Sequence, residues 1–148
     1  MIRPTPGVAR SIDRTERCEL LAQLHDWQLR QLVDELGDVE TTIVTEPTVG
    51  MLMMRVREDA LGDTFHLGEV LVTECLVRVA DQEGWAMLMG SRSDGARLAA
   101  TIDAAIAAFP EREASLETSL ADFSATLQAA QAAHHARLAP TRVRFETQ

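Results

Sequence analysis

The stretch from Thr64 to Ala80 constrains the fold of this chain more than any other segment. It is the longest apolar-rich stretch without a helical period, and its Val, Leu, Thr and Cys content is typical of a strand. Alternation places one set of side chains on a face of buried character: Leu71, Thr73, Cys75, Val77 and Val79. The other face begins apolar and ends charged: Val70, Val72, Glu74, Leu76 and Arg78. We predict a central strand whose far end reaches a surface, a ligand or a partner.

Two features inside this strand point to a contact surface. Gly68 and Glu69 are expected to form a bulge or a bend, because glycine weakens a strand unless the backbone must distort there. Glu69 and Glu74 also place carboxylates within an apolar segment. Each carboxylate there requires a partner, access to water or an interface.

The remaining segments predict an α+β fold. N-terminal helices are expected from about Arg14 to Leu24, capped by Asp13, and from a cap at Asp26 to Leu36, with Gly37 ending the second helix. About four strands then form an antiparallel meander over 39–46, 51–57, 64–80 and 85–89, joined by a bend at 47–50, the polar turn EDALGD and a turn at 81–84. Two C-terminal helices follow, the first from Asp94 to Phe109, and a short terminal strand lies in TRVRFETQ. Pro110 separates the two helices, and the second is expected to become regular from Ser119 and to end before Pro140. We expect one domain over 1–148, with 1–10 as a loose tail.

Charge and composition exclude several classes of function. The net charge of −9 argues against nucleic acid, which needs a basic face, and weakly against an anionic membrane. The sequence contains no run of 18 apolar residues and no signal-like apolar segment, so no membrane span and a cytoplasmic location are expected. Cys18 and Cys75 are predicted to be inert thiols in a reducing compartment.

A search for chemistry finds no catalytic constellation. The histidines His25, His66, His134 and His135 have no ligand spacing, so neither metal nor another cofactor is predicted. The turn Gly90–Gly95, which carries Arg92, is either an ordinary connector or an anion site at a helix N-terminus. Arginines in the predicted strands, namely Arg55, Arg57, Arg78, Arg142 and Arg144, either face solvent or bind an anion or a partner's acidic groups. Five methionines are expected to fill the core, with a partner surface as the alternative: Met51, Met53, Met54, Met87 and Met89.

A set of individually weak motifs runs in order along nearly the whole chain. It begins at Pro47, Gly50, Met51, Leu52, Met54 and Arg55, and continues through Gly62, Phe65, Gly68, Glu69, Thr73, Val77, Arg78 and Val79. It ends with Gly84, Gly90, Ala96, Ile102, Asp103 and Ala104, then Thr141, Arg142, Val143, Phe145 and Thr147. This ordered set resembles PhnG, the small subunit of the bacterial carbon–phosphorus lyase system. The sequence departs from the family pattern at Asp59-Ala60, Glu74, Ser91-Arg92, Gly95, Arg144 and Glu146, so polar positions change while the apolar framework is kept.

The resemblance implies an accessory, non-catalytic subunit of a transferase, ribose 1-methylphosphonate 5-triphosphate synthase. That complex transfers an alkylphosphonate to the ribose C1 of ATP and releases adenine. Its other subunits would be the partners, above all the large PhnI-type subunit, and the isolated chain is expected to form a homo-oligomer. The expected contact residues are Gly68, Glu69, Glu74, Arg78, Arg92, Arg55 and Arg142. The alternative is an independent homo-oligomeric protein, diverged from that family, that binds a small anion.

Overall fold

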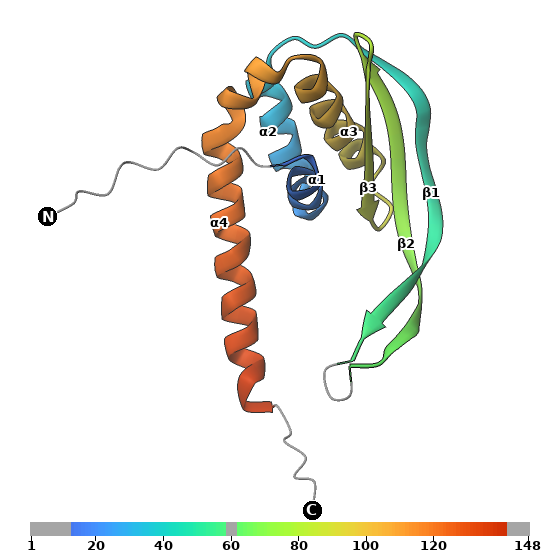
Figure 1. Ribbon diagram of the computed structural model, residues 1–148, viewed down its shortest axis with the longest axis vertical. Helices are drawn as coiled ribbons and strands as arrows, with labels where there is room; N and C mark the ends of the chain where they lie inside the picture. The colour runs from blue at the N-terminus through green and yellow to red at the C-terminus, as the bar shows by residue number, and fades with distance from the viewer. Residues whose placement is uncertain (1–12, 59–61, 142–148) are drawn as a thin grey trace, which may run out of the picture.

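A computed structural model describes residues 13–58 and 62–141 of the chain, and its elements alternate from helical to extended and back (Figure 1). The helices at the start are α1 (Arg14–Gln23) and α2 (Asp26–Leu36). The strands are β1 (Thr41–Arg57), β2 (Thr64–Val79) and β3 (Gln82–Met89). After them come α3 (Ser93–Ala108), the 3-10 helix η1 (Pro110–Arg112), α4 (Glu113–Leu138) and the 3-10 helix η2 (Ala139–Thr141). This order confirms the α+β class.

The sheet is antiparallel, in the order β1-β2-β3, and the described residues contain three strands rather than about four. The two extended pieces expected at 39–46 and 51–57 form the single strand β1. The bend expected at 47–50 is wrong, because the pairing with β2 only skips from Thr45 to Thr48 there. Pro47 lies in that irregularity on an edge strand, where a missing N–H costs no ladder hydrogen bond. The turn expected at 81–84 is also shorter, because β3 already begins at Gln82.

The strands differ in length, and this mismatch shapes the molecule. β3 pairs with β2 only between Val72 and Val79. Residues 51–57 of β1 and 64–71 of β2 therefore continue as a two-stranded ribbon without a third strand, which we call the arm. Figure 1 shows the arm projecting past β3 and α3 and curving as it leaves the sheet, while α4 extends in the same direction on the other side of the molecule.

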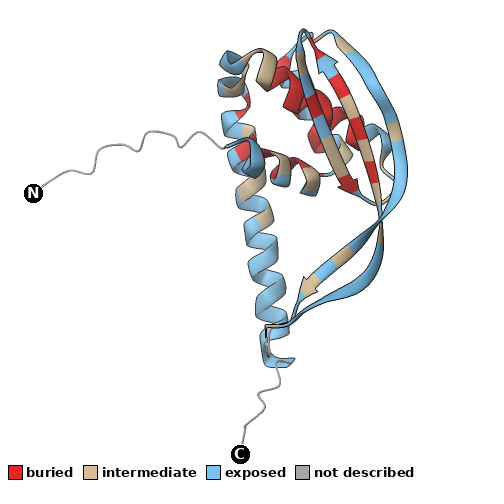
Figure 2. Cartoon of the chain, turned by 45° about the vertical axis from the view of Figure 1, so that its right-hand side comes forward, coloured by how far each residue is buried: buried red, intermediate tan, exposed pale blue. Residues whose placement is uncertain are grey.

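The core lies between one face of the sheet and α3. Thr73, Cys75, Val77 and Val79 are almost fully buried there, as the alternation of the central strand predicts. Leu71 is 45% exposed, so the prediction is wrong at this position, because the strand has already passed the end of β3. Figure 2 shows the buried residues gathered in α3 and the sheet beside it, while the arm and the lower half of α4 are exposed.

The helices surround α3. Buried leucines of α1, α2 and α4 complete the core: Leu20, Leu21, Leu24, Leu29, Leu32, Leu36, Leu116 and Leu120. α4 contacts α2 with its first turns only, and every residue of α4 beyond Leu127 is exposed. The apolar stripe expected along this helix thus packs in its first half alone. No helix in the described ranges is long and apolar enough to cross a membrane.

Tertiary contacts decide several helix ends. Asp13 caps α1 as predicted, since its Oδ1 accepts from the N–H of Glu16 at 2.8 Å. Asp26 is not the cap of α2, which begins after His25, and Asp94 is not the cap of α3, which begins at Ser93. α4 starts at Glu113 and not near Ser119, whose hydroxyl donates to Glu35 Oε1 at 2.9 Å. The terminal strand expected in TRVRFETQ lies, apart from Thr141, outside the described residues, and so does the tail at 1–10.

Candidate partner-binding surface

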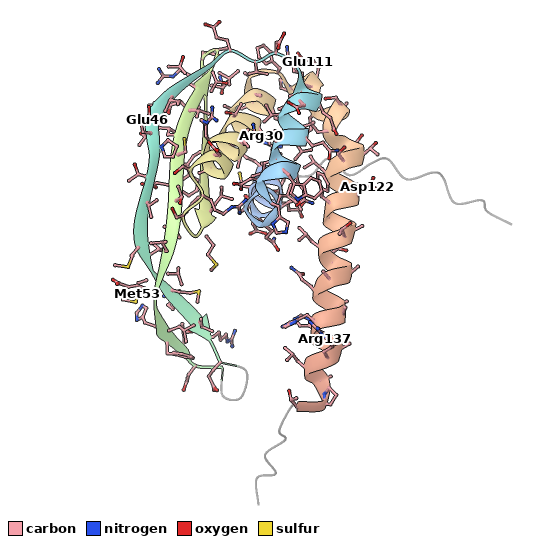
Figure 3. The ribbon with its side chains drawn as sticks, turned by 180° about the vertical axis from the view of Figure 1, so that it is seen from behind. Arg30, Glu46, Met53, Glu111, Asp122 and Arg137 are labelled. Carbon is pink, nitrogen blue, oxygen red and sulfur yellow. The ribbon has the colours of Figure 1, made fainter. Side chains whose placement is uncertain are left out.

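The arm carries apolar side chains that the described part of the chain leaves uncovered. Met51 is 68% exposed, Leu67 58%, Met53 52%, Leu52 49% and Phe65 45%. Figure 3 labels Met53 on the arm, across an open space from Arg137 near the end of α4. A two-stranded ribbon is marginally stable in water unless it packs on something, and a contiguous exposed apolar patch marks an interaction site. These side chains are therefore the strongest interface signal of the molecule.

The glycine of the arm sits at a real irregularity. The pairing skips between Met54 and Arg55, so that Leu67 is an extra residue between Gly68 and His66. Gly68 has φ +146°, a conformation that favours glycine. The distortion predicted at Gly68 and Glu69 is thus present on the Leu67 side of the glycine. It turns the ribbon where its exposed apolar residues are densest.

The outer face of the sheet, opposite α3, carries the two charged residues expected there. Glu74 is half-buried between Thr48 and Met87, and it forms no hydrogen bond or ion pair within the part of the chain that the structure describes. Arg78 is exposed and pairs with Glu83 at 2.5 Å. The face also exposes Trp85, opposite Leu76 on β2. This face remains open to a partner next to the arm.

The other predicted contact residues do not join this surface in one cluster. Arg92 forms an ion pair with Asp26 and donates from Nη2 to the carbonyl of Leu24 at 2.7 Å. Its guanidinium holds the start of α2 against α3 and is not directed at the turn it comes from. Arg55 is exposed on the arm, opposite His66. Arg142 lies outside the described residues.

The methionines show what sequence patterns leave open. Met51, Met53 and Met89 are exposed, and Met54 and Met87 are half-buried, so none belongs to the buried core. Their clustering on two strands was the available signal, and it fits a partner surface as well as a core. The exposed Phe65 and Leu67 had no separate signal, because their alternation is that of any strand.

A buried charged cluster joins α1, α3 and β3. Asp103 is 1% exposed and accepts from Arg14 at 3.0 Å (Nε) and 2.7 Å (Nη2), and from the backbone N–H of Trp85 at 3.3 Å. Arg17 Nη2 lies 3.6 Å from the same carboxylate, and Arg17 Nη1 lies 3.0 Å from Glu113 Oε1. This carboxylate is saturated with donors, so it organises the fold and has no free oxygen to offer a substrate. The described residues contain no group of three acidic, histidine or cysteine side chains that could hold a metal ion.

Cys18 lies beside this cluster and should react slowly with alkylating reagents. Burial raises the pKa of the Cys18 thiol, and the neighbouring Asp103 carboxylate raises this pKa further. A raised pKa lowers the thiolate fraction at any given pH, and the thiolate is the reactive form. We expect alkylation of Cys18 by iodoacetamide at pH 8 to be several-fold slower than that of glutathione, and to accelerate as the pH rises above 9. Peptide mass spectrometry measures the rate of alkylation. If Cys18 and glutathione reacted at equal rates at pH 8, the raised pKa of Cys18 would be contradicted.

An apolar groove opens between α1 and the outer edge of β3. It encloses about 420 Å³ and is lined by Cys18, Glu19, Leu21, Ala22, Leu52, Met54, Val70, Val72, Trp85, Ala86, Met87, Met89 and Ala99. Glu19 is the sole charged side chain among these lining residues. The groove therefore suits apolar side chains, and it is continuous with the inner part of the arm.

Taken together, the fold and its surfaces define a small α+β protein with an uncovered apolar ribbon, a class typical of subunits that complete their packing on another chain. The model of the family described as phosphonate metabolism protein PhnG matches residues 12–148. A relative from Rhizobium meliloti (strain 1021), alpha-D-ribose 1-methylphosphonate 5-triphosphate synthase subunit PhnG, is 35% identical over 143 residues, which cover 95% of this chain and 89% of the relative. The chain belongs to the PhnG family.

Proposed function

We propose that this protein is an accessory subunit of a phosphonate-processing transferase, the ribose 1-methylphosphonate 5-triphosphate synthase of the carbon–phosphorus lyase system. The observation that carries the proposal is the exposed arm in a chain that belongs to the PhnG family. The relative from Rhizobium meliloti is named as a subunit of that synthase. In this role the chain supports the transfer of an alkylphosphonate to the ribose C1 of ATP, and a cytoplasmic location goes with the use of ATP.

The arm is the proposed contact with a companion subunit, the large PhnI-type subunit above all. Its exposed side chains would be buried on the companion, and each contributes about half of the roughly 1.5–3 kcal/mol of a full burial, because each is already about half buried in the free chain. Glu74 and Arg78 on the adjoining outer face would supply polar contacts at the rim, where charges set the register of an interface. The independent small-anion-binding alternative has no support here, because Arg92 is held by Asp26 and Leu24.

Introducing a charge on the arm should abolish the complex while the fold survives. Leu67→Glu places a carboxylate at a residue that is 58% exposed in the free chain. Burial of that charge at the interface is costly, so co-purification with the PhnI-type subunit should fall at least tenfold. The measurement is affinity co-purification of the co-expressed pair, with circular dichroism to verify the fold.

Leu138→Glu is the matched control, because Leu138 is also exposed, at 49%, but lies on α4 away from the arm. This variant should retain the companion. The proposal is wrong if the unaltered chain and the PhnI-type subunit separate cleanly on a sizing column. A selective loss in Leu138→Glu would instead move the interface from the arm to α4.

A further inference from the structure

Along the edge of β3 that faces away from β2, backbone groups of Glu83 and Trp85 are hydrogen-bonded within the described residues, whereas those of Met87 and Met89, the open half of this edge, are not. Arg14 Nη2 donates to the carbonyl of Glu83 at 3.2 Å, and the N–H of Trp85 donates to Asp103 Oδ2 at 3.3 Å. These contacts show that the odd-numbered residues of β3 direct their backbone groups outward, away from β2. By the same alternation, Met87 and Met89 direct their N–H and C=O groups outward. No hydrogen bond reaches those groups within residues 13–58 and 62–141.

This open half of the edge borders the apolar groove. Met87 and Met89 line the groove from the sheet, and Cys18, Leu21 and Ala22 line it from α1. A row of unpaired strand donors and acceptors beside apolar walls is the geometry that binds an extended segment as an added strand. A helix could fill the groove with apolar side chains but would leave the edge groups unpaired. The edge therefore selects a strand.

The C-terminal segment of the chain has the composition that this site requires. In residues 142–148, Val143 and Phe145 alternate with Arg142 and Arg144. Apolar side chains on one side of an added strand would enter the groove beside Met87 and Met89, and the arginines on the other side would face the acidic surroundings of a chain with net charge −9. The match to the family model extends through this segment to residue 148.

The segment cannot reach the groove of its own chain. Gln131 Nε2 lies 3.1 Å from Gln23 Oε1 at the end of α1, and the helical chain continues for ten further residues to Thr141, about 15 Å onward. Figure 1 shows this part of α4 leading away from α1 and β3. Phe145 extends at most about 14 Å beyond Thr141, which only returns it to the level of Gln131. The width of α1, about 10 Å, still separates that point from the edge of β3.

We propose that the groove at the open half of the β3 edge binds the C-terminal segment 142–148 of a second copy of this chain as an added strand. Exchange in both directions closes a two-fold dimer, in which each copy completes the other's sheet. Val143 and Phe145 then lie beside Cys18, Leu21 and Ala22. This inference concerns the isolated chain and does not depend on the companion subunit.

Cys18 provides a direct test, because it lines the groove and is a free thiol. The variant Phe145→Cys, oxidised mildly with copper phenanthroline at alkaline pH, should form a disulfide to Cys18 of the other copy and run as a covalent dimer on a non-reducing gel. Arg144→Cys is the matched control, since its side chain would point away from the groove, and it should give at least fivefold less dimer. Adding Cys18→Ser to Phe145→Cys should remove the dimer.

Truncation after Thr141 is the second measurement. The truncated chain keeps all described elements, so it should fold, and sedimentation velocity should show a shift from dimer to monomer. Three results would each overturn the proposal: a Cys18 disulfide within one chain, equal cross-linking of Arg144→Cys, or unchanged sedimentation after truncation. If truncation instead abolishes binding of the companion subunit and leaves the dimer unchanged, residues 142–148 bind that partner. The strand exchange between two copies is then refuted, while the proposed function stands.

Discussion

Replacing Gly84 with alanine is expected to lower the free energy of unfolding by about 3 kcal/mol or more, a large part of the roughly 5–15 kcal/mol that stabilises a typical domain. A Cβ at this position would lie 2.2 Å from the carbonyl oxygen of Ala100, 2.3 Å from the amide nitrogen of Ala104 and 2.7 Å from the Ala104 Cβ. Two of these neighbours are backbone atoms of α3, so no rotamer change relieves the overlap. The helix would have to move away from β3, which would open the core between α3 and the sheet.

Gly50→Ala is the control for this prediction. A Cβ on Gly50 meets nothing within 4 Å, so the free energy of unfolding should change by less than about 0.5 kcal/mol. The measurement is urea denaturation followed by circular dichroism. If Gly84→Ala were as stable as Gly50→Ala, α3 would not approach β3 as closely as the structure shows.

Replacing Asp103 with alanine has the second largest expected effect, a loss of about 3–5 kcal/mol in the free energy of unfolding. Arg17 is 5% exposed, and removal of the carboxylate leaves its guanidinium buried with only Glu113 as an ionic partner among the described residues. The backbone N–H of Trp85 loses its acceptor at the same time. An uncompensated buried charge costs far more than the pair itself contributes, which is why the loss is large.

Asp94→Ala is the matched control, because it also removes an aspartate from α3. Asp94 forms an ion pair with Arg97, and both side chains of that pair are exposed. Exposed pairs contribute about 0–1 kcal/mol, so this variant should unfold at nearly the same urea concentration as the original chain. Equal midpoints for Asp94→Ala and Asp103→Ala would show that the buried cluster does not hold α1, α3 and β3 together.

The central strand shows how far alternation predicts burial. The pattern from Thr73 to Val79 identifies the core face correctly, because a period of two fixes which side chains share a face. It fails at Leu71, whose neighbours in sequence look the same as those of Val77. The difference is that β3 ends at Met89, opposite Val72, so nothing covers Leu71. The sequence of β2 alone does not predict the residue at which the neighbouring strand β3 ends.

The candidate contact residues also differ in whether the sequence could predict their environment. Gly68 and its irregularity could be predicted because glycine in a strand has a local cause, whereas Arg92 appeared free because its partner Asp26 lies 66 residues earlier. Asp103 gave no local signal of a buried cluster either, since Arg14 is 89 residues away. Charges in a sequence become ion pairs only when packing brings distant elements together.

The sequence by itself determined the α+β class, the antiparallel strands, the core face of β2 and the resemblance to PhnG, because each depends on periodicity or on ordered motifs within short stretches. Only the tertiary structure decided that two expected strands are one, that the arm extends beyond the end of β3, and that Met51, Met53 and Met89 are exposed. The physical reason is that burial is a property of pairs of elements. An apolar side chain becomes core or interface according to which neighbour reaches it, and no element of the described chain covers Met51, Met53 or Leu67 on the arm.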